Sequence, residues 1–108
     1  MVLDEDFYMG PGRADLLAGI EATGSIGAAG KAMAMSYKRA WSLVQALNEG
    51  FGAPLVETSR GGSAQGGASL TPAGREVLAR YRAMEAKTAA AIADDLEAIK
   101  GLRRDISG

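Results

Sequence analysis

The feature that most constrains the fold is a pair of helical patterns between residues 25 and 51, joined by a tight turn at Ala34-Met35. The second pattern runs from about Tyr37 to Gly50, and at about 100° per residue its apolar side chains share one side. These apolar residues are Ala40, Leu43, Val44, Leu47 and Phe51. The opposite side is polar and nearly free of acids, and it carries Lys38, Ser42, Gln45 and Glu49. The pattern predicts a helix that packs on one face and exposes a face with cations.

Small residues dominate the first pattern, which begins after Ser25 and reaches about Met33. They are Ala28, Ala29, Gly30 and Ala32. Small side chains allow two helices to approach closely, as the supporting helix of a helix-turn-helix must. Ser25 and Ser36 each precede a helical pattern, and serine is a favoured N-cap residue. The sequence therefore predicts two tightly packed helices with defined starting points.

Another helix is predicted before this pair. Gly10-Pro11-Gly12 interrupts the chain after a strand-like segment at residues 2–9. From Arg13 the apolar residues recur at helical spacing, and Thr23-Gly24 is typical of a helix C-terminus. The sequence therefore predicts a further helix that ends just before the pair begins.

The residues after Pro54 predict a hairpin and then a long helix. The β-branched segment Leu55–Thr58 favours a strand, and Ser69-Leu70 is the expected return strand. Between them, Ser59–Ala68 contains four glycines and is expected to form a flexible tip. Thr71-Pro72 then begins a helix, because threonine suits the N-cap and proline the first turn. Its apolar positions are Leu78, Tyr81, Met84, Thr88, Ile92, Leu96, Ile99 and Leu102.

A helix from Pro72 to about Leu102 is too long to bury its apolar stripe within one small domain, so a dimer is expected. The predicted fold class is mainly α with a small β-hairpin: one winged helix-turn-helix domain over residues 1–108, with a long C-terminal dimerisation helix. The helix-turn-helix covers about residues 25–51, the wing about 55–70 and the long helix about 72–102. Residues expected at the dimer interface are Tyr81, Thr88, Ile92, Leu96 and Ile99.

A winged helix-turn-helix places its exposed second helix in the major groove of DNA, where base acceptors are bordered by phosphates. The residues expected to contact DNA are Ser36, Tyr37, Lys38, Arg39, Trp41, Ser42, Gln45, Arg60, Ser63 and Gln65. Trp41 lies at the edge of the apolar stripe, so partial burial in the core is an alternative for it. Arg60 could bind a phosphate or form a surface ion pair.

The charge of the chain supports DNA binding only within residues 25–75. The 108-residue chain has a net charge of −1, but residues 25–75 contain five bases and two acids and so carry +3. Such asymmetry permits one face to meet phosphates while the ends stay acidic.

Composition limits the chemistry. The chain has no Cys and no His, which excludes disulfides, Cys/His zinc sites and imidazole bases, and we expect no enzyme activity, metal or cofactor. The glycine-rich tip lacks the Gly-Lys-Ser/Thr ending of a P-loop. The carboxylates of Asp94, Asp95 and Glu97 point in different directions on one helix, as on a solvated face. An acidic N-terminus and the lack of a long apolar run predict a cytoplasmic chain without a membrane partner.

Several fragments resemble the DNA-binding domain of the molybdate-responsive transcription regulators of the ModE type. They are Thr23-Gly24-Ser25-Ile26, Met35-Ser36-Tyr37-Lys38-Arg39-Ala40-Trp41, Leu55-Val56-Glu57 with Gly61-Gly62, and Gly66 to Gly74. A looser pattern, which includes Leu70-Thr71-Pro72-Ala73-Gly74, is shared with the LysR-type regulators. The resemblance implies a dimeric winged helix that binds a palindromic operator on double-stranded DNA.

Full-length members of that group carry a C-terminal molybdate-binding part, whereas only six residues follow Leu102 here. We therefore expect that this chain alone does not bind molybdate and that it acts as a stand-alone regulator. A protein-interaction module with the same fold and little DNA affinity is the alternative, which the acidic net charge keeps open.

Overall fold

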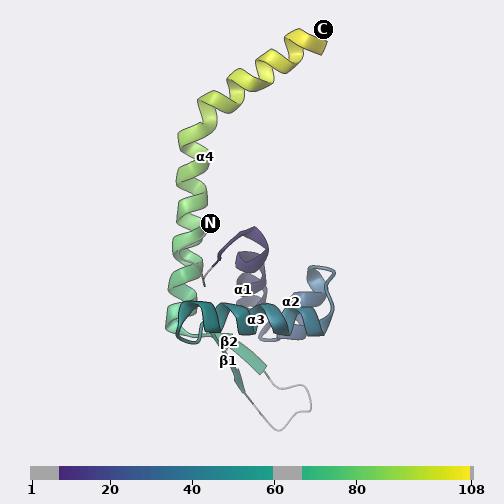
Figure 1. Cartoon of the computed structure of the whole chain (residues 1–108), viewed down its shortest axis with the longest axis vertical. Coiled ribbons are helices and arrows are strands. Elements are labelled where there is room, and N and C mark those ends of the chain that lie inside the picture. Colours follow the sequence, from purple (N-terminus) through teal and green to yellow (C-terminus); the bar gives the residue numbers. More distant parts are fainter. Residues whose placement is uncertain (1–7, 60–66, 108) are drawn as a thin grey trace. The chain divides into compact units, whose positions relative to one another are not determined.

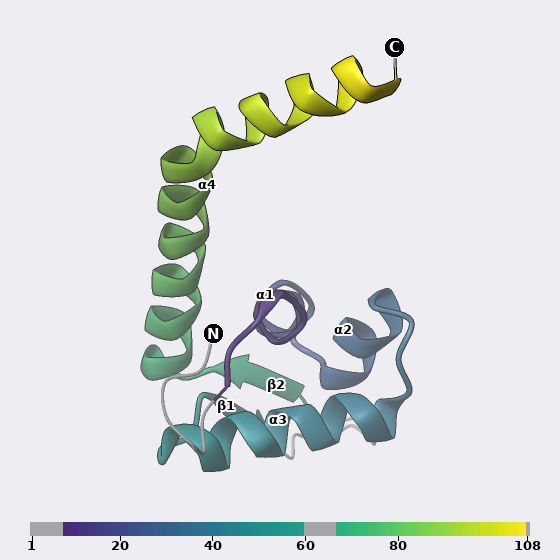
Figure 2. The ribbon, with the colours of Figure 1, turned by 45° about the horizontal axis from the view of Figure 1, so that its top comes forward.

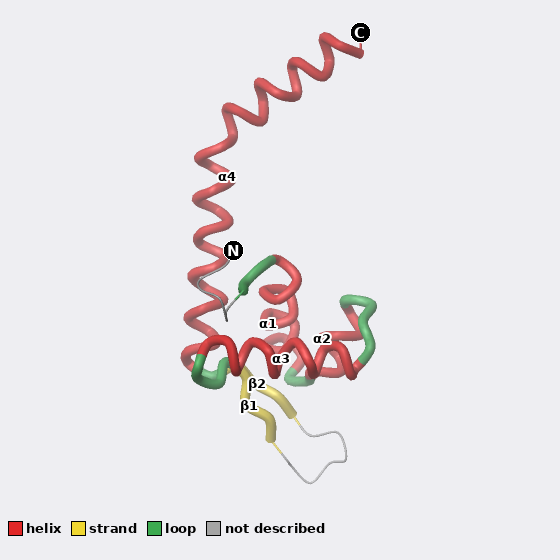
Figure 3. Tube along the Cα trace, viewed as in Figure 1, coloured by secondary structure: helices red, strands yellow, loops and turns green. Residues whose placement is uncertain are grey.

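The computed structural model describes residues 8–59 and 67–107, and within them it contains four helices and one antiparallel hairpin (Figure 1). The helices are α1 (Pro11–Thr23), α2 (Ile26–Ala32), α3 (Tyr37–Phe51) and α4 (Pro72–Ser107), and the strands are β1 (Val56–Ser59) and β2 (Gly67–Leu70). Figure 3 shows this order along the Cα trace. The predicted fold class is confirmed. The chain divides into two compact units, one ending at Leu78 and the other beginning at Ala79.

The helix starts follow local capping signals. The side-chain oxygens of Ser25, Ser36 and Thr71 accept hydrogen bonds from the backbone N–H groups of the residues three positions later, at 3.0, 3.1 and 3.0 Å. Gly24 ends α1 in the left-handed conformation, with φ of 70°, and its N–H donates to the carbonyl of Ile20. All four predicted caps are confirmed.

Some boundaries differ from the prediction. Helix α1 begins at Pro11 and not at Arg13, because the proline lacks the N–H that a first helical turn leaves unpaired. Helix α4 continues beyond Leu102 to Ser107. The strands are β1 from Val56 and β2 from Gly67, so the return strand is longer than expected. The strand-like segment predicted for residues 2–9 lies mostly outside the described residues.

The core of the first unit forms where α1, α2 and β2 lie over one side of α3 (Figure 2). Three positions of the predicted α3 stripe, Ala40, Val44 and Leu47, are almost fully buried, and Leu43 is half-buried. Phe51, however, is 40% exposed, so its predicted place in the core was wrong. It is the last residue of α3, and the left-handed Gly52 then turns the chain away.

Close helix packing in this unit depends on glycine. A Cβ added at Gly30 in α2 would lie 2.8 Å from the Cβ of Ala40 in α3. A Cβ added at Gly19 in α1 would lie 3.0 Å from the Cβ of Ala29 in α2. Of the small residues predicted to allow close helix approach, Ala29 and Gly30 therefore lie where the helices meet, whereas Ala28 and Ala32 are exposed.

Polar bonds attach the hairpin to α3. The Asn48 side chain accepts from the N–H groups of Leu55 and Val56 at 2.8 and 3.1 Å, and it donates to the Val56 carbonyl at 3.2 Å. Val56 pairs with Leu70 across the hairpin, and both side chains are buried. The N–H of Ala68 also donates to the carbonyl of Gly24 at 2.9 Å, so β2 is bonded to the turn that joins α1 and α2.

The turn between α2 and α3 contains a strained residue. Ala34 has φ of 58°, the left-handed conformation that side chains with a Cβ disfavour. Glycine adopts this conformation at no steric cost, so Ala34→Gly should raise the free energy of unfolding by about 0.5–1 kcal/mol. Urea denaturation followed by circular dichroism measures the change. Ala28→Gly in helix α2 is the matched control, and it should lower stability. A decrease for both variants would contradict the argument.

Candidate nucleic-acid interface

One face of α3 remains open in the folded first unit. Lys38, Ser42, Gln45 and Glu49, which the sequence placed opposite the apolar stripe, are all exposed. We call these four residues the outer face of α3. Because the stripe on the other side holds α3 in the core, the outer face is fixed in space by buried contacts and not by its own side chains.

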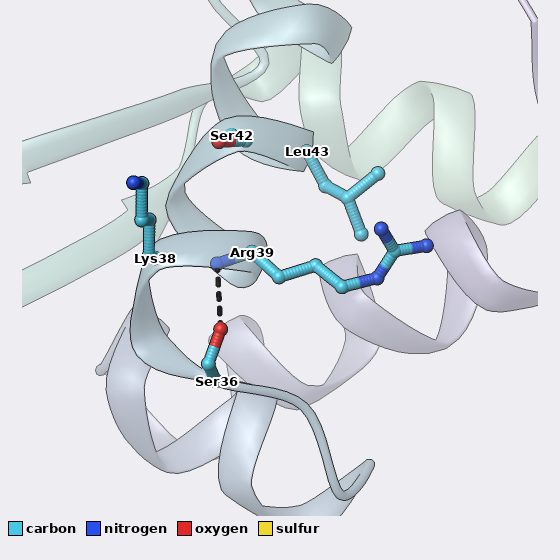
Figure 4. Close-up of a pocket in the computed structure, with 5 residues that line it drawn as sticks. All are labelled: Ser36, Lys38, Arg39, Ser42 and Leu43. Carbon is cyan, nitrogen blue, oxygen red and sulfur yellow. Dashed lines mark hydrogen bonds between the residues drawn. The ribbon is translucent and has the colours of Figure 1, made fainter.

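An open hollow of about 320 Å³ lies at the start of α3, and it is lined by Ser36, Lys38, Arg39, Ser42 and Leu43 (Figure 4). In this view the side chains of Lys38 and Arg39 point to opposite sides of the helix. The hydroxyl of Ser36 is engaged with the backbone N–H of Arg39. The hollow is therefore bordered by two cations that diverge from one helical turn.

Among the described residues, neither Lys38 nor Arg39 has a partner for its charged group. Both residues are exposed, and their neighbour Ser36 bonds only to backbone. Acidic side chains on α3 are confined to Glu49, near the other end of the helix. Two unpaired cations are thus available to a negatively charged ligand.

Aromatic side chains flank the outer face on one side. Tyr37, the first residue of α3, is 62% exposed, whereas Trp41 is half-buried, as its boundary position allowed. At about 100° per residue, both lie on the flank opposite to Arg39. The structure therefore places seven of the predicted contact residues at the N-cap and in the first nine residues of α3: Ser36, Tyr37, Lys38, Arg39, Trp41, Ser42 and Gln45.

Other parts of the predicted site are not placed. Arg60, Ser63 and Gln65 at the hairpin tip lie outside the described residues. Lys31, an exposed cation in the last turn of α2, is absent from the predicted DNA contacts. Its charge next to the turn was the signal that could have added it to the candidate residues.

The second unit exposes the apolar stripe of α4. Ile92 and Leu96 are 41% and 44% exposed, and Ile99 is 61% exposed. Tyr81 is half-buried and Thr88 exposed. Met84 and Leu102, which the interface prediction omitted, are also exposed large apolar residues.

No helix in the described part of the chain is long and apolar enough to span a membrane. Nor do residues 8–59 and 67–107 contain a cluster of acidic ligands suited to a metal ion.

The three-helix core, the hairpin and the open α3 face define a winged helix-turn-helix protein. The chain belongs to the lysR family of bacterial regulatory helix-turn-helix proteins, whose family model matches residues 14–75. The match begins in α1 and ends in the first turn of α4, so it includes the helix pair and the hairpin.

Curated relatives show which proteins with this helix-turn-helix the chain resembles. The chain is 45% identical over 102 residues to the molybdenum-pterin-binding protein MopB of Rhodobacter capsulatus, covering 87% of this chain and 38% of MopB. It is 44% identical over 73 residues to the molybdenum transport protein ModE of Azotobacter vinelandii, covering 68% of this chain and 27% of ModE. The similarity to ModE-type proteins predicted from the sequence is confirmed. The chain spans well under half the length of these relatives.

Solved structures give the same fold. The DNA-binding domain of CbnR, in a crystal structure of its DNA complex, matches with a TM-score of 0.62 and 26% identity, covering 83% of this chain and 97% of that chain. VV2_1132, a LysR family transcriptional regulator, matches with a TM-score of 0.60 and 18% identity, covering 81% of this chain and 28% of that chain. The latter similarity concerns the fold alone.

Proposed function

We propose that this chain is a sequence-specific, DNA-binding transcription regulator, without enzyme activity, that acts as a dimer on a palindromic operator. The observation that carries the proposal is the outer face of α3, which presents the cation of Lys38 and the hydrogen-bonding side chains of Ser42 and Gln45 from a rigidly packed helix. The CbnR domain, which shares this fold, is in complex with DNA in its crystal structure.

The outer face matches the chemistry of the major groove. Ser42 and Gln45 offer donors and acceptors that can bond to base edges, while Lys38 can bond to guanine acceptors or to a phosphate. Arg39 lies on the flank of the helix, where the phosphates that border a groove would be within reach. Lys31 in α2 adds a further cation near the same helix start. We propose that wing residues Arg60, Ser63 and Gln65 contact DNA beside this helix.

The exposed stripe of α4 supports the dimer. A second copy could cover the apolar surfaces of Ile92, Leu96 and Ile99, which one chain leaves open to water. Two copies related by a two-fold axis would present two α3 helices, and such symmetry requires a palindromic site.

Selection of bound sequences from a random DNA pool tests the function. The expected result is a recurring motif with two inverted halves, bound by the wild-type chain with an affinity that falls steeply as salt rises. No enrichment over the starting pool, together with no salt-dependent binding, would contradict the proposal and favour a protein-interaction module.

The dimer is tested by a charge placed on the α4 stripe. Ile92→Glu would bury an unpaired carboxylate between two chains, so it should convert the dimer to monomer at micromolar concentration and lower the melting temperature. Ala90→Glu is the matched control, because Ala90 lies about 160° away around the same helix. Light scattering measures the mass of both variants. A dimer mass for Ile92→Glu, or a monomer mass for the wild type, would contradict the interface.

We propose that DNA binding by this chain does not respond to molybdate. Helix starts supply N–H donors for oxyanions, but the starts of α2, α3 and α4 are each capped by the side chain of the residue that precedes the helix. Millimolar molybdate added to the DNA-binding assay should leave the affinity unchanged. Saturable molybdate binding that alters DNA affinity would overturn this proposal.

A further inference from the structure

Tyr37 is an exposed aromatic residue whose ring packs against helix α2. A Cβ added at Gly27 in α2 would lie 3.3 Å from Cδ2 and 3.6 Å from Cε2 of the Tyr37 ring. The ring edge of Tyr37 therefore packs against Gly27, which has no side chain to displace it. The rest of the ring remains open, since the residue is 62% exposed.

The position of Tyr37 on α3 directs it away from the centre of the outer face. At about 100° per residue, Tyr37 lies roughly 100° from Lys38 and more than that from Ser42. Helical side chains also tilt toward the N-terminus, which carries the Tyr37 ring back toward α2. A residue on the flank of a groove-binding helix faces the groove edge, which is made of phosphates, and not the base pairs below.

The hydroxyl of Tyr37 has no hydrogen-bond partner among the described residues. A phenol at a groove edge is a donor suited to a phosphate oxygen. Resting on the proposed function, we infer that Tyr37, seated against Gly27, donates a hydrogen bond to a backbone phosphate at the edge of the groove that α3 enters. This contact positions α3 on the duplex and carries no sequence information.

The variant Tyr37→Phe removes the hydroxyl and keeps the ring. Its affinity should fall about tenfold, because a hydrogen bond to a charged group is lost. The loss should be equal for the duplex selected by the wild type and for the same duplex with its motif scrambled. The salt dependence should not change, since a neutral hydroxyl releases no counterion. Tyr8→Phe, which removes the hydroxyl of another exposed tyrosine of the first unit, is the matched control and should bind like the wild type.

Two further measurements locate the contact. Gly27→Ala should weaken binding to both duplexes, by less than Tyr37→Phe does, while circular dichroism remains that of the folded chain, because the new methyl group shifts the ring by a few tenths of an ångström. In duplexes with single methylphosphonates, one replacement should weaken the wild type about tenfold and leave Tyr37→Phe unaffected. Fluorescence anisotropy of the same labelled duplexes measures the binding of every variant.

Several results would overturn the inference while the proposed function stands. They are a wild-type affinity for Tyr37→Phe, a loss confined to the selected motif, or the absence of any phosphate whose replacement abolishes the effect of the variant. A wild-type affinity for Gly27→Ala would contradict a role in DNA binding for the packing of the Tyr37 ring against Gly27. If the wild-type chain itself bound neither duplex, the proposed function would fail and the inference with it.

Discussion

Gly74→Ala is expected to destabilise the first unit by about 2–4 kcal/mol. A Cβ at this position in the first turn of α4 would overlap the carbonyl oxygen of Leu55, which is backbone and has no rotamer to adopt. The same carbonyl accepts from the N–H of Thr71 at 2.9 Å and from its hydroxyl at 3.3 Å. Movement of either segment to relieve the overlap would therefore weaken the bonds between the hairpin and α4.

Urea denaturation measures this change, and α4 offers a matched control. Gly101 lies in the same helix, and a Cβ added there would meet nothing within 4 Å. Gly101→Ala should therefore be neutral or stabilising by up to about 1 kcal/mol, as alanine favours helix. Equal stability of the wild type and Gly74→Ala would contradict the packing of α4 against Leu55.

The double variant Lys38→Ala/Arg39→Ala is expected to lose at least about a hundredfold in DNA affinity. Each charged contact contributes about 1.5–3 kcal/mol, and 1.4 kcal/mol corresponds to tenfold. Both side chains are exposed, so their truncation opens no cavity and the fold should persist. Binding isotherms at several salt concentrations measure the loss.

The single variants Lys38→Ala and Arg39→Ala distinguish a contact to phosphate from a contact to a base. A residue that contacts phosphate should lower affinity for every sequence and reduce the salt slope by about one, whereas a base contact should relax specificity instead. Lys87→Ala, which removes an exposed lysine from the second unit, is the control for a general loss of charge. Unchanged affinity in both single variants would remove α3 from the proposed interface.

Local signals were sufficient to predict most elements of this fold. The N-caps Ser25, Ser36 and Thr71 and the C-cap Gly24 act through hydrogen bonds to residues within four positions, so the sequence contains both partners. The exposure of Lys38 and Ser42 followed from helical periodicity for the same reason.

Features that depend on distant residues could not be predicted. The Asn48 amide bonds to the hairpin because α3 and β1 meet, and its polar character alone suggests only a surface position. Periodicity placed Phe51 in the core, but periodicity does not reveal where a helix ends. The need for glycine at position 74 likewise arises from the backbone of Leu55, nineteen residues earlier.

The most direct test of the proposed function is a cross-link from the outer face of α3. Because the chain contains no cysteine, Ser42→Cys introduces a single thiol at an exposed position of that face. Duplexes of the selected motif, each with one thiol-bearing base, can then be scanned for disulfide formation. Gly12→Cys, at the exposed start of α1, is the matched control. We expect Ser42→Cys to cross-link to bases inside the motif and Gly12→Cys to give no cross-link. Cross-links from Gly12→Cys, with none from Ser42→Cys at any base, would contradict DNA recognition by α3.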